Sequence, residues 1–267
     1  MADLQKAEFA VRPPVEALSS RDRRIILACL GAVILLAWAY LVHLDRQMSA
    51  AMEHAAMMSD MAMPWTAADV LFTFGMWVVM MVAMMAAPAA SVLLLFARAQ
   101  ASRGANVVPL TGSFALGYGL VWTGFSSCAV IAQWALHSAA VLSPGMAASS
   151  PLLAGAILCV AGAYQFTPLK SVCLAHCRSP LGFLVARWRD GKFGALEMGV
   201  RHGLYCLGCC WALMAILFAV GVMNLLWVAA LSLLVLIEKV APAGTTVARV
   251  AGALIIGAGL LALFGPR

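Results

Sequence analysis

Residues 202–237 read HGLYCLGCCWALMAILFAVGVMNLLWVAALSLLVLI, and this stretch decides the class of fold. It contains no Asp, Glu, Lys or Arg. A helix needs roughly 20 apolar residues to cross the hydrocarbon core of a bilayer, so the stretch is long enough for two crossings. A Gly and an Asn near its middle, Gly221 and Asn224, predict a turn between them. We therefore expect a tight helical hairpin within a membrane.

The rest of the chain has the same apolar character. Hydrophobic residues make up 64% of the 267 residues and charged residues only 10%, whereas about a quarter of a soluble domain is charged. This composition excludes a soluble enzyme. The eight cysteines lie mostly in or beside apolar runs, which excludes a disulfide-rich secreted domain. The fold predicted is an all-α, polytopic transmembrane helix bundle.

Charge-free runs predict about seven membrane spans in one transmembrane domain, residues 25–267. The expected spans are 25–44, 70–97, 113–136, 151–169, two within 202–237, and a short one at 247–264. A turn at Ser143-Pro144-Gly145 separates the third span from the fourth. Residues 1–24 are predicted to be a polar cytoplasmic segment. No small-residue cleavage pattern follows the first apolar run, so that run is expected to be a retained anchor.

The distribution of basic residues predicts a cytoplasmic N-terminus. With that orientation, all but two of the 17 Lys and Arg fall on the cytoplasmic side, and Arg46 and Arg267 are the exceptions. Lys and Arg are retained on this side during membrane insertion. A basic cytoplasmic loop is expected over residues 170–196. The net charge of +6 is therefore explained by the orientation of the chain in the membrane and does not indicate nucleic-acid binding.

Two further expectations concern packing. Lys239 and Arg249 lie at predicted helix ends, where long basic side chains extend to the membrane interface. The glycines of GSFALGYG, at positions 112, 117 and 119, suit close contacts between helices.

Methionine is concentrated between residues 48 and 85, which hold eleven of the sixteen in the chain. One group lies in an outer loop predicted over residues 45–66, among histidines and carboxylates: Met48, Met52, Met57, Met58, Met61, Met63, His43, His54, Asp45, Glu53 and Asp60. In the second group, Met76, Met80 and Met84 recur every four residues and line one helical face. Thioether and imidazole ligands suit copper, especially Cu(I). The alternative is that these flexible side chains only pack.

Cysteine and histidine are concentrated at the predicted cytoplasmic end of the fourth span and in the fifth. Residues 164–180, YQFTPLKSVCLAHCRSP, place Cys173 and Cys177 one helical turn apart, with His176 between them. Residues 197–214, EMGVRHGLYCLGCCWALM, carry one helical stripe of possible ligands: Met198, His202, Cys206 and Cys209, with Cys210 at its edge. Side by side, these segments would supply a thiolate and imidazole metal site.

Other interpretations of the cysteines stay open at this point. Free cysteine is a favoured buried residue, so the thiols could simply pack. We expect this for Cys29, Cys128 and Cys159, which have no neighbouring ligands in the sequence. An accessible Cys-x-x-Cys-Cys could also perform thiol redox chemistry. The density of soft ligands excludes magnesium and calcium but does not separate copper from zinc.

The chain resembles the bacterial predicted metal-binding integral membrane proteins, a domain family of unknown function, over about residues 65–260. The resemblance depends on the Met-rich string of residues 77–88, on both cysteine motifs, on GVMNLLWV at 221–228, and on Glu238-Lys239. It implies metal binding and a multi-pass protein of the bacterial inner (cytoplasmic) membrane. It implies neither transport nor catalysis.

These observations favour a membrane protein that handles a transition metal, foremost copper, with zinc or another transition metal less favoured. Its expected partners are the lipid bilayer, the metal ion, and a metal chaperone or membrane enzyme. Two alternatives remain: a metal-dependent or thiol-redox membrane enzyme, and a membrane scaffold whose cysteines only pack. No nucleophile with its base, nucleotide-binding loop or HExxH pattern marks a catalytic site, so whether the chain is an enzyme stays open.

Overall fold

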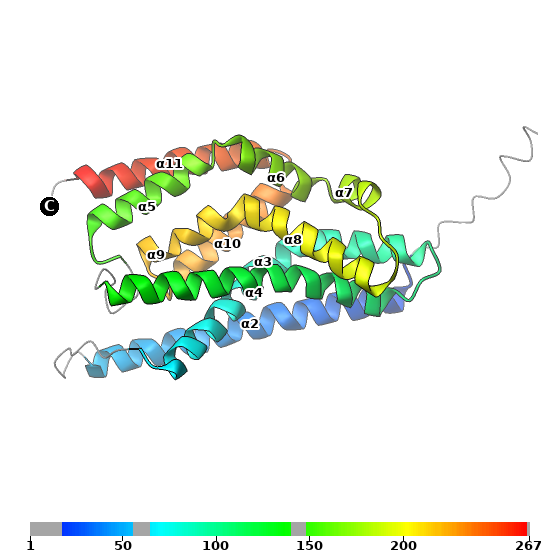
Figure 1. Ribbon diagram of the computed structural model, residues 1–267, viewed down its shortest axis with the longest axis horizontal. Helices are drawn as coiled ribbons and strands as arrows, with labels where there is room; N and C mark the ends of the chain where they lie inside the picture. The colour runs from blue at the N-terminus through cyan, green and yellow to red at the C-terminus, as the bar shows by residue number, and fades with distance from the viewer. Residues whose placement is uncertain (1–17, 56–64, 140–147, 266–267) are drawn as a thin grey trace, which may run out of the picture.

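The computed structural model describes residues 18–55, 65–139 and 148–265 (Figure 1). These residues form helices joined by short turns, without any β-strand among them, as the apolar sequence predicts. The helices are α2 (Ser20–Ala55), α3 (Ala67–Ala101), α4 (Val107–Ser138), α5 (Pro151–Tyr164), α6 (Pro168–Arg178), α7 (Pro180–Ala186), α8 (Gly191–Ala215), α9 (Leu217–Val220), α10 (Leu225–Val240) and α11 (Gly244–Phe264).

The long helices run along a common direction (Figure 1). Helix α2 packs on α3 at one side of the bundle, and α5 packs on α11 at the other. Between these pairs, α4 packs along α8, and α10 packs on α3. The main core is built around large buried side chains such as Trp77 and Phe114. The Trp77 indole N–H donates to Gln133 Oε1 at 2.7 Å, which satisfies two buried polar groups and joins α3 to α4.

Within the described ranges, five segments are long and apolar enough to cross a membrane: Ser20–Met48, Ala67–Ala101, Val107–Ser138, Gly191–Val220 and Gly244–Phe264. Helices α5 and α6 are bent by 62° and count as a sixth only if taken together. Helix α10 has 16 residues and falls short of a full crossing. The predicted number of about seven spans is therefore not confirmed, and the sidedness of the bundle stays a prediction.

The predicted hairpin break lies where the sequence places it. Helix α9 ends at Gly221, whose φ of 103° is in the left-handed region that glycine adopts without steric cost. Asn224 then caps α10, because its side chain accepts a hydrogen bond from the Trp227 backbone N–H at 3.4 Å.

The two predicted loops contain more helix than expected. Helix α2 continues to Ala55, so the first half of the Met-rich segment is helical. The side chains of Met52, Glu53 and His54 and the whole of residues 56–64 lie outside the described residues, as does the predicted turn at 143–145. The predicted loop 170–196 is mostly helical, because α6, α7 and the first turn of α8 fall within it.

Only one of the three glycines of GSFALGYG makes the predicted close contact. A Cβ at Gly117 would lie 2.9 Å from the Val200 backbone nitrogen and closer still to the Leu196 carbonyl oxygen on α8. Nothing lies within 4 Å of a Cβ at Gly112 or Gly119. The absence of a side chain at Gly117 therefore lets α4 and α8 approach, whereas the other two glycines face open space.

We expect Gly117→Ala to destabilise the bundle by about 1–3 kcal/mol, because α4 and α8 must move apart to admit the methyl group. Gly119→Ala is the matched control on the same helix, and it should be neutral or stabilising by up to about 1 kcal/mol through its better helix propensity. Thermal unfolding of the detergent-purified variants measures both. Equal unfolding temperatures for the two variants would contradict the close contact.

Candidate metal centre

Four cysteines from α6 and α8 converge in the core. The Sγ atoms of Cys177 and Cys209 are 3.9 Å apart, and those of Cys209 and Cys210 are 3.2 Å apart. Cys206 lies about one helical turn before Cys209 and Cys210 in α8, on the same buried part of that helix. Cys177 is 8% exposed and the other three are at most 1% exposed. We call Cys177, Cys206, Cys209 and Cys210 the thiol cluster.

The bend between α5 and α6 brings Cys177 to this position. Helix α5 ends at Tyr164, and α6 restarts with Pro168 in its first turn, where the ring costs no hydrogen bond. Thr167 caps α6 by accepting from the Lys170 backbone N–H at 3.3 Å. The new direction of α6 carries it against α8, so that its last turn presents Cys177 to the three cysteines of α8.

Cys206 has two further polar neighbours from distant parts of the chain. The Lys239 ammonium donates to Cys206 Sγ at 2.9 Å, and the Tyr118 phenol oxygen lies 3.0 Å from the same sulfur. The Tyr118 hydroxyl also donates to the Met85 carbonyl oxygen at 3.2 Å. Helices α3, α4 and α10 therefore all contribute to the surroundings of one thiol.

The interfacial position predicted for Lys239 is wrong, because its ammonium reaches inward to Cys206. Arg249 is exposed, as expected for a basic residue at a helix end. Sequence reasoning also missed Tyr118, which lies among glycines without any ligand motif. The only signal for Lys239 was its place in a Glu-Lys pair that closes a long charge-free run.

A buried ion pair fixes α6 against α10 next to the thiol cluster. Lys170 Nζ and Glu238 Oε2 are 2.7 Å apart, and each side chain is 1% exposed. Arg178 also donates to the backbone carbonyls of Glu238 and Pro242, at 2.6 and 2.9 Å. Because Cys177 lies between Lys170 and Arg178 in α6, these contacts hold its helix in place.

The remaining predicted ligands of α8 lie near the thiol cluster without joining it. His202 is buried among the rings of Phe114, Tyr118 and Phe183, with centroid distances of 6.1, 6.0 and 5.4 Å. Its Nδ1 has no hydrogen-bond partner among the residues placed by the structure. Met198 is also buried, but its Sδ accepts the Arg189 backbone N–H at 3.3 Å, near the start of α8.

The two predicted ligands of α6 besides Cys177 lie outside the cluster. Cys173 borders it, because its Sγ would be 2.6 Å from a Cβ on Gly208 of α8. His176 is exposed, and its ring stacks on Tyr205 of α8. On α3, the side chains of Met76, Met80 and Met84 are each at most 1% exposed and belong to the main core. Packing therefore remains a sufficient explanation for that methionine face.

The thiols are close enough to bind one ion but are packed against one another. For metal–sulfur bonds of about 2.3 Å, two ligands at a tetrahedral angle are about 3.8 Å apart. The 3.9 Å between Cys177 and Cys209 matches this spacing, and the 3.2 Å between Cys209 and Cys210 is too short. In the placed ranges 18–55, 65–139 and 148–265, no three His, Cys, Asp or Glu side chains have the geometry of a ready-formed metal site.

A comparison with protein families supplies the broader context for this cluster. The family model PpoB2, described as a copper chaperone, matches residues 74–262 of the chain. The match covers more than two thirds of the chain. The chain belongs to this copper chaperone family. The match supports the metal-related part of the resemblance expected from the sequence. Comparisons with curated proteins and with solved structures give no match.

The part of the chain that matches the copper chaperone family contains the whole thiol cluster together with Tyr118 and Lys239. It also contains the methionine face of α3. The Met-rich segment at residues 45–66 lies before the matched range. The family match therefore includes the buried thiols and leaves out the Met-rich segment at residues 45–66.

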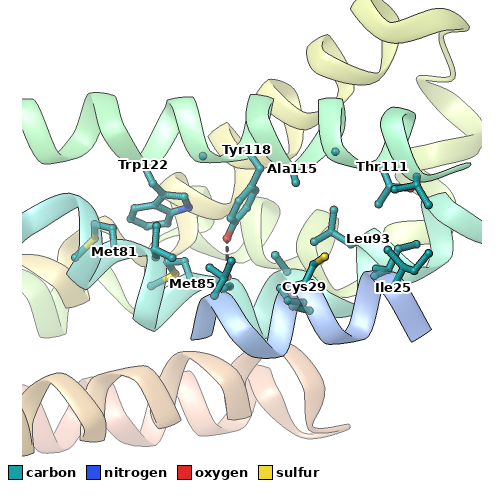
Figure 2. Close-up of a pocket in the computed structure, with 18 residues that line it drawn as sticks. Ile25, Cys29, Met81, Met85, Leu93, Thr111, Ala115, Tyr118 and Trp122 are labelled. Atoms are coloured by element: carbon teal, nitrogen blue, oxygen red, sulfur yellow. Dashed lines mark hydrogen bonds between the residues drawn. The ribbon is translucent and has the colours of Figure 1, made fainter. Parts of the chain in front are cut away.

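An apolar cavity of about 350 Å³ lies on the other side of Tyr118, between α2, α3 and α4 (Figure 2). Its walls include Cys29, Met81, Met85 and Trp122, and the open side of Gly119. The Tyr118 ring lines this cavity, while its hydroxyl meets Met85 and Cys206. Tyr118 therefore contacts both the cavity and the thiol cluster.

Proposed function

We propose that the chain is a membrane-embedded copper chaperone that binds Cu(I) in the thiol cluster and passes it to a protein partner. The observation that carries the proposal is the convergence of Cys177 from α6 with Cys206, Cys209 and Cys210 from α8, beside the Lys239 ammonium. Family membership supports copper as the ion. The apolar helices support integration in a membrane. The distribution of Lys and Arg supports a cytoplasmic N-terminus, and the bacterial inner membrane is part of the proposal.

Family membership, and not ligand chemistry, favours Cu(I) over zinc at this cluster. Thiolates are soft donors that suit both ions. Either ion would require the sulfurs of Cys209 and Cys210 to move apart from their distance of 3.2 Å. One Cu⁺ held by two thiolates carries a net charge of −1, which the Lys239 ammonium neutralises. Burial away from water strengthens this electrostatic contribution.

The test is copper binding by the full-length protein in detergent under anaerobic, reducing conditions. We expect one Cu(I) per chain after elemental analysis, retained against a competing chelator, and no stoichiometric zinc when both ions are supplied. A chain that holds neither ion would overturn the proposal.

The thiol-redox alternative is favoured by the short distances between sulfur atoms. The Sγ of Cys209 lies 3.2 Å from that of Cys210 and 3.9 Å from that of Cys177. Thiol labelling before and after mild oxidation distinguishes the two functions. Protection from labelling that depends on copper supports the chaperone. Reversible disulfide formation that copper does not affect would support the oxidoreductase.

We expect Lys239→Leu to weaken Cu(I) binding by about 10–100-fold, the usual range when a group that supports metal ligands is lost. Leu offers no copper ligand and leaves the anionic copper–thiolate complex without a counter-charge. Lys239→Arg keeps the charge and should retain more affinity than Lys239→Leu. Competition with a Cu(I) chelator measures both, and equal affinities in all three proteins would remove the role of Lys239.

A further inference from the structure

A second cavity, of about 380 Å³, lies where α6, α7 and α8 meet. His176, Arg187 and Tyr205 are among the residues that line it. His176 precedes Cys177 in α6, and Tyr205 precedes Cys206 in α8. The helical turns that carry the buried sulfurs therefore also form the wall of this cavity.

His176 is held in the orientation of a metal ligand. Its Nδ1 lies 2.9 Å from the Val172 carbonyl oxygen. A carbonyl can only accept, so Nδ1 carries the hydrogen and the neutral ring keeps its lone pair on Nε2. Metal-binding histidines usually donate their other ring N–H to such a carbonyl or to a carboxylate. The ring also stacks on Tyr205, with centroids 4.3 Å apart and planes 7° from parallel.

The position of His176 complements the burial of the thiols. Cys206, Cys209 and Cys210 are at most 1% exposed, so an ion from outside cannot meet them first. Cys177 is the most exposed member of the cluster, at 8%, and it directly follows the exposed His176. His176 and Cys177 are neighbouring residues of α6, so an ion passed between their side chains stays on one helical turn.

We infer that His176 is the exchange ligand of the copper site, an inference that rests on the proposed function. Its Nε2 binds Cu(I) in the cavity and passes it to Cys177, and the reverse steps release it. During loading, a Cu–N bond forms as the Cu–S bond to an external thiolate breaks, and that thiolate leaves with its electron pair. A Cu–S bond to Cys177 then forms as the Cu–N bond breaks, and the Cys177 thiol gives its proton to the departed thiolate. Copper stays Cu(I), no electron is transferred, and the Nδ1 proton stays in place.

The charge of the cavity indicates the class of donor and acceptor. Cu(I) bound by two thiolates is an anion with a net charge of −1. Arg187 lines the cavity and provides a complementary positive charge. The cavity therefore suits anionic Cu(I)–thiolate complexes as donors and acceptors of copper. The thiolates can belong to a small molecule or to a protein.

A transient ligand has a distinct kinetic signature. It lowers the barrier for loading and for release without contributing to the resting site. Its removal should therefore slow both rates by the same factor, about 10-fold or more, and leave the Kd unchanged. A resting ligand would instead change the Kd, because its bond to copper is present in the bound state.

The experiment follows Cu(I) loading from a Cu(I)–glutathione complex and Cu(I) release to bathocuproine disulfonate, using the full-length protein in detergent. The variants are His176→Ala and the control His137→Ala, a half-buried histidine at the end of α4 that stacks near Trp65. We expect His176→Ala alone to slow both rates, with an unchanged Kd. Added imidazole should restore them by occupying the space beside Tyr205.

The outcomes separate the inference from the proposed function. A wild-type chain that retains no copper overturns the proposed function. Copper retained with equal exchange rates in wild type and His176→Ala overturns the exchange role alone. A weaker Kd in His176→Ala would make His176 a resting ligand and would also overturn that role.

Discussion

Cys206→Ser combined with Cys209→Ser is expected to reduce bound copper from one ion per chain to none at concentrations that saturate the wild type. Serine is close to cysteine in size but offers a hard oxygen donor, which Cu(I) disfavours. The double change also removes the sulfur that meets Lys239 and the sulfur shared between Cys177 and Cys210. Elemental analysis and chelator competition on the purified variant measure the loss.

The matched control for this prediction is Cys128→Ser combined with Cys159→Ser. These cysteines lie on α4 and α5, outside the thiol cluster, with Cys128 exposed and Cys159 half-buried. The control should bind copper like the wild type. Full copper binding by the Cys206 and Cys209 variant would instead show that copper binds outside the thiol cluster and that these cysteines only pack.

Glu238→Ala is expected to destabilise the protein by about 3–5 kcal/mol, because it leaves the Lys170 ammonium buried without its partner. Both side chains are 1% exposed, so water cannot replace the lost carboxylate without opening the core. The pair also joins α6 to α10, and its loss should loosen the helix that carries Cys177. Thermal or denaturant unfolding in detergent measures the change.

Two variants test the origin of this effect. Replacing both partners by apolar residues, Lys170→Met with Glu238→Leu, should recover most of the lost stability, as buried ion pairs elsewhere often show. Glu197→Ala removes a partly exposed carboxylate that pairs with Arg189 and Arg201, and should cost under about 1 kcal/mol. If Glu238→Ala is no more destabilising than Glu197→Ala, the ion pair does not hold α6.

Much of the fold follows from hydropathy alone. Charge-free runs predict the positions of the long helices and the break at Gly221, because apolar length and turn residues are local properties of the sequence. The number of spans is harder to predict. Helix α10 is short, and the bend between α5 and α6 depends on how Pro168 and the buried Lys170 pack against other helices.

The candidate site could be predicted only where its residues share a helix. The stripe from Met198 to Cys209 is a consequence of helical periodicity, and its residues are buried as expected. Tyr118 and Lys239 reach Cys206 from α4 and α10, and tertiary contacts of this kind leave no periodic signal in one sequence. Hydropathy places Lys239 at the interface, but a specific partner in the core outweighs that general tendency.

The four sulfurs of the thiol cluster are divided between α6 and α8, and this division affects how copper is released. Cys206, Cys209 and Cys210 belong to the continuous helix α8, which packs closely on α4 at Gly117. Cys177 belongs to α6, a helix of eleven residues that follows the bend after α5. The Lys170–Glu238 ion pair and Arg178 hold α6 against α10. Release through Cys177 therefore breaks a copper–sulfur bond to a side chain of a fixed helix, and neither the thiols of α8 nor the buried ion pair has to move.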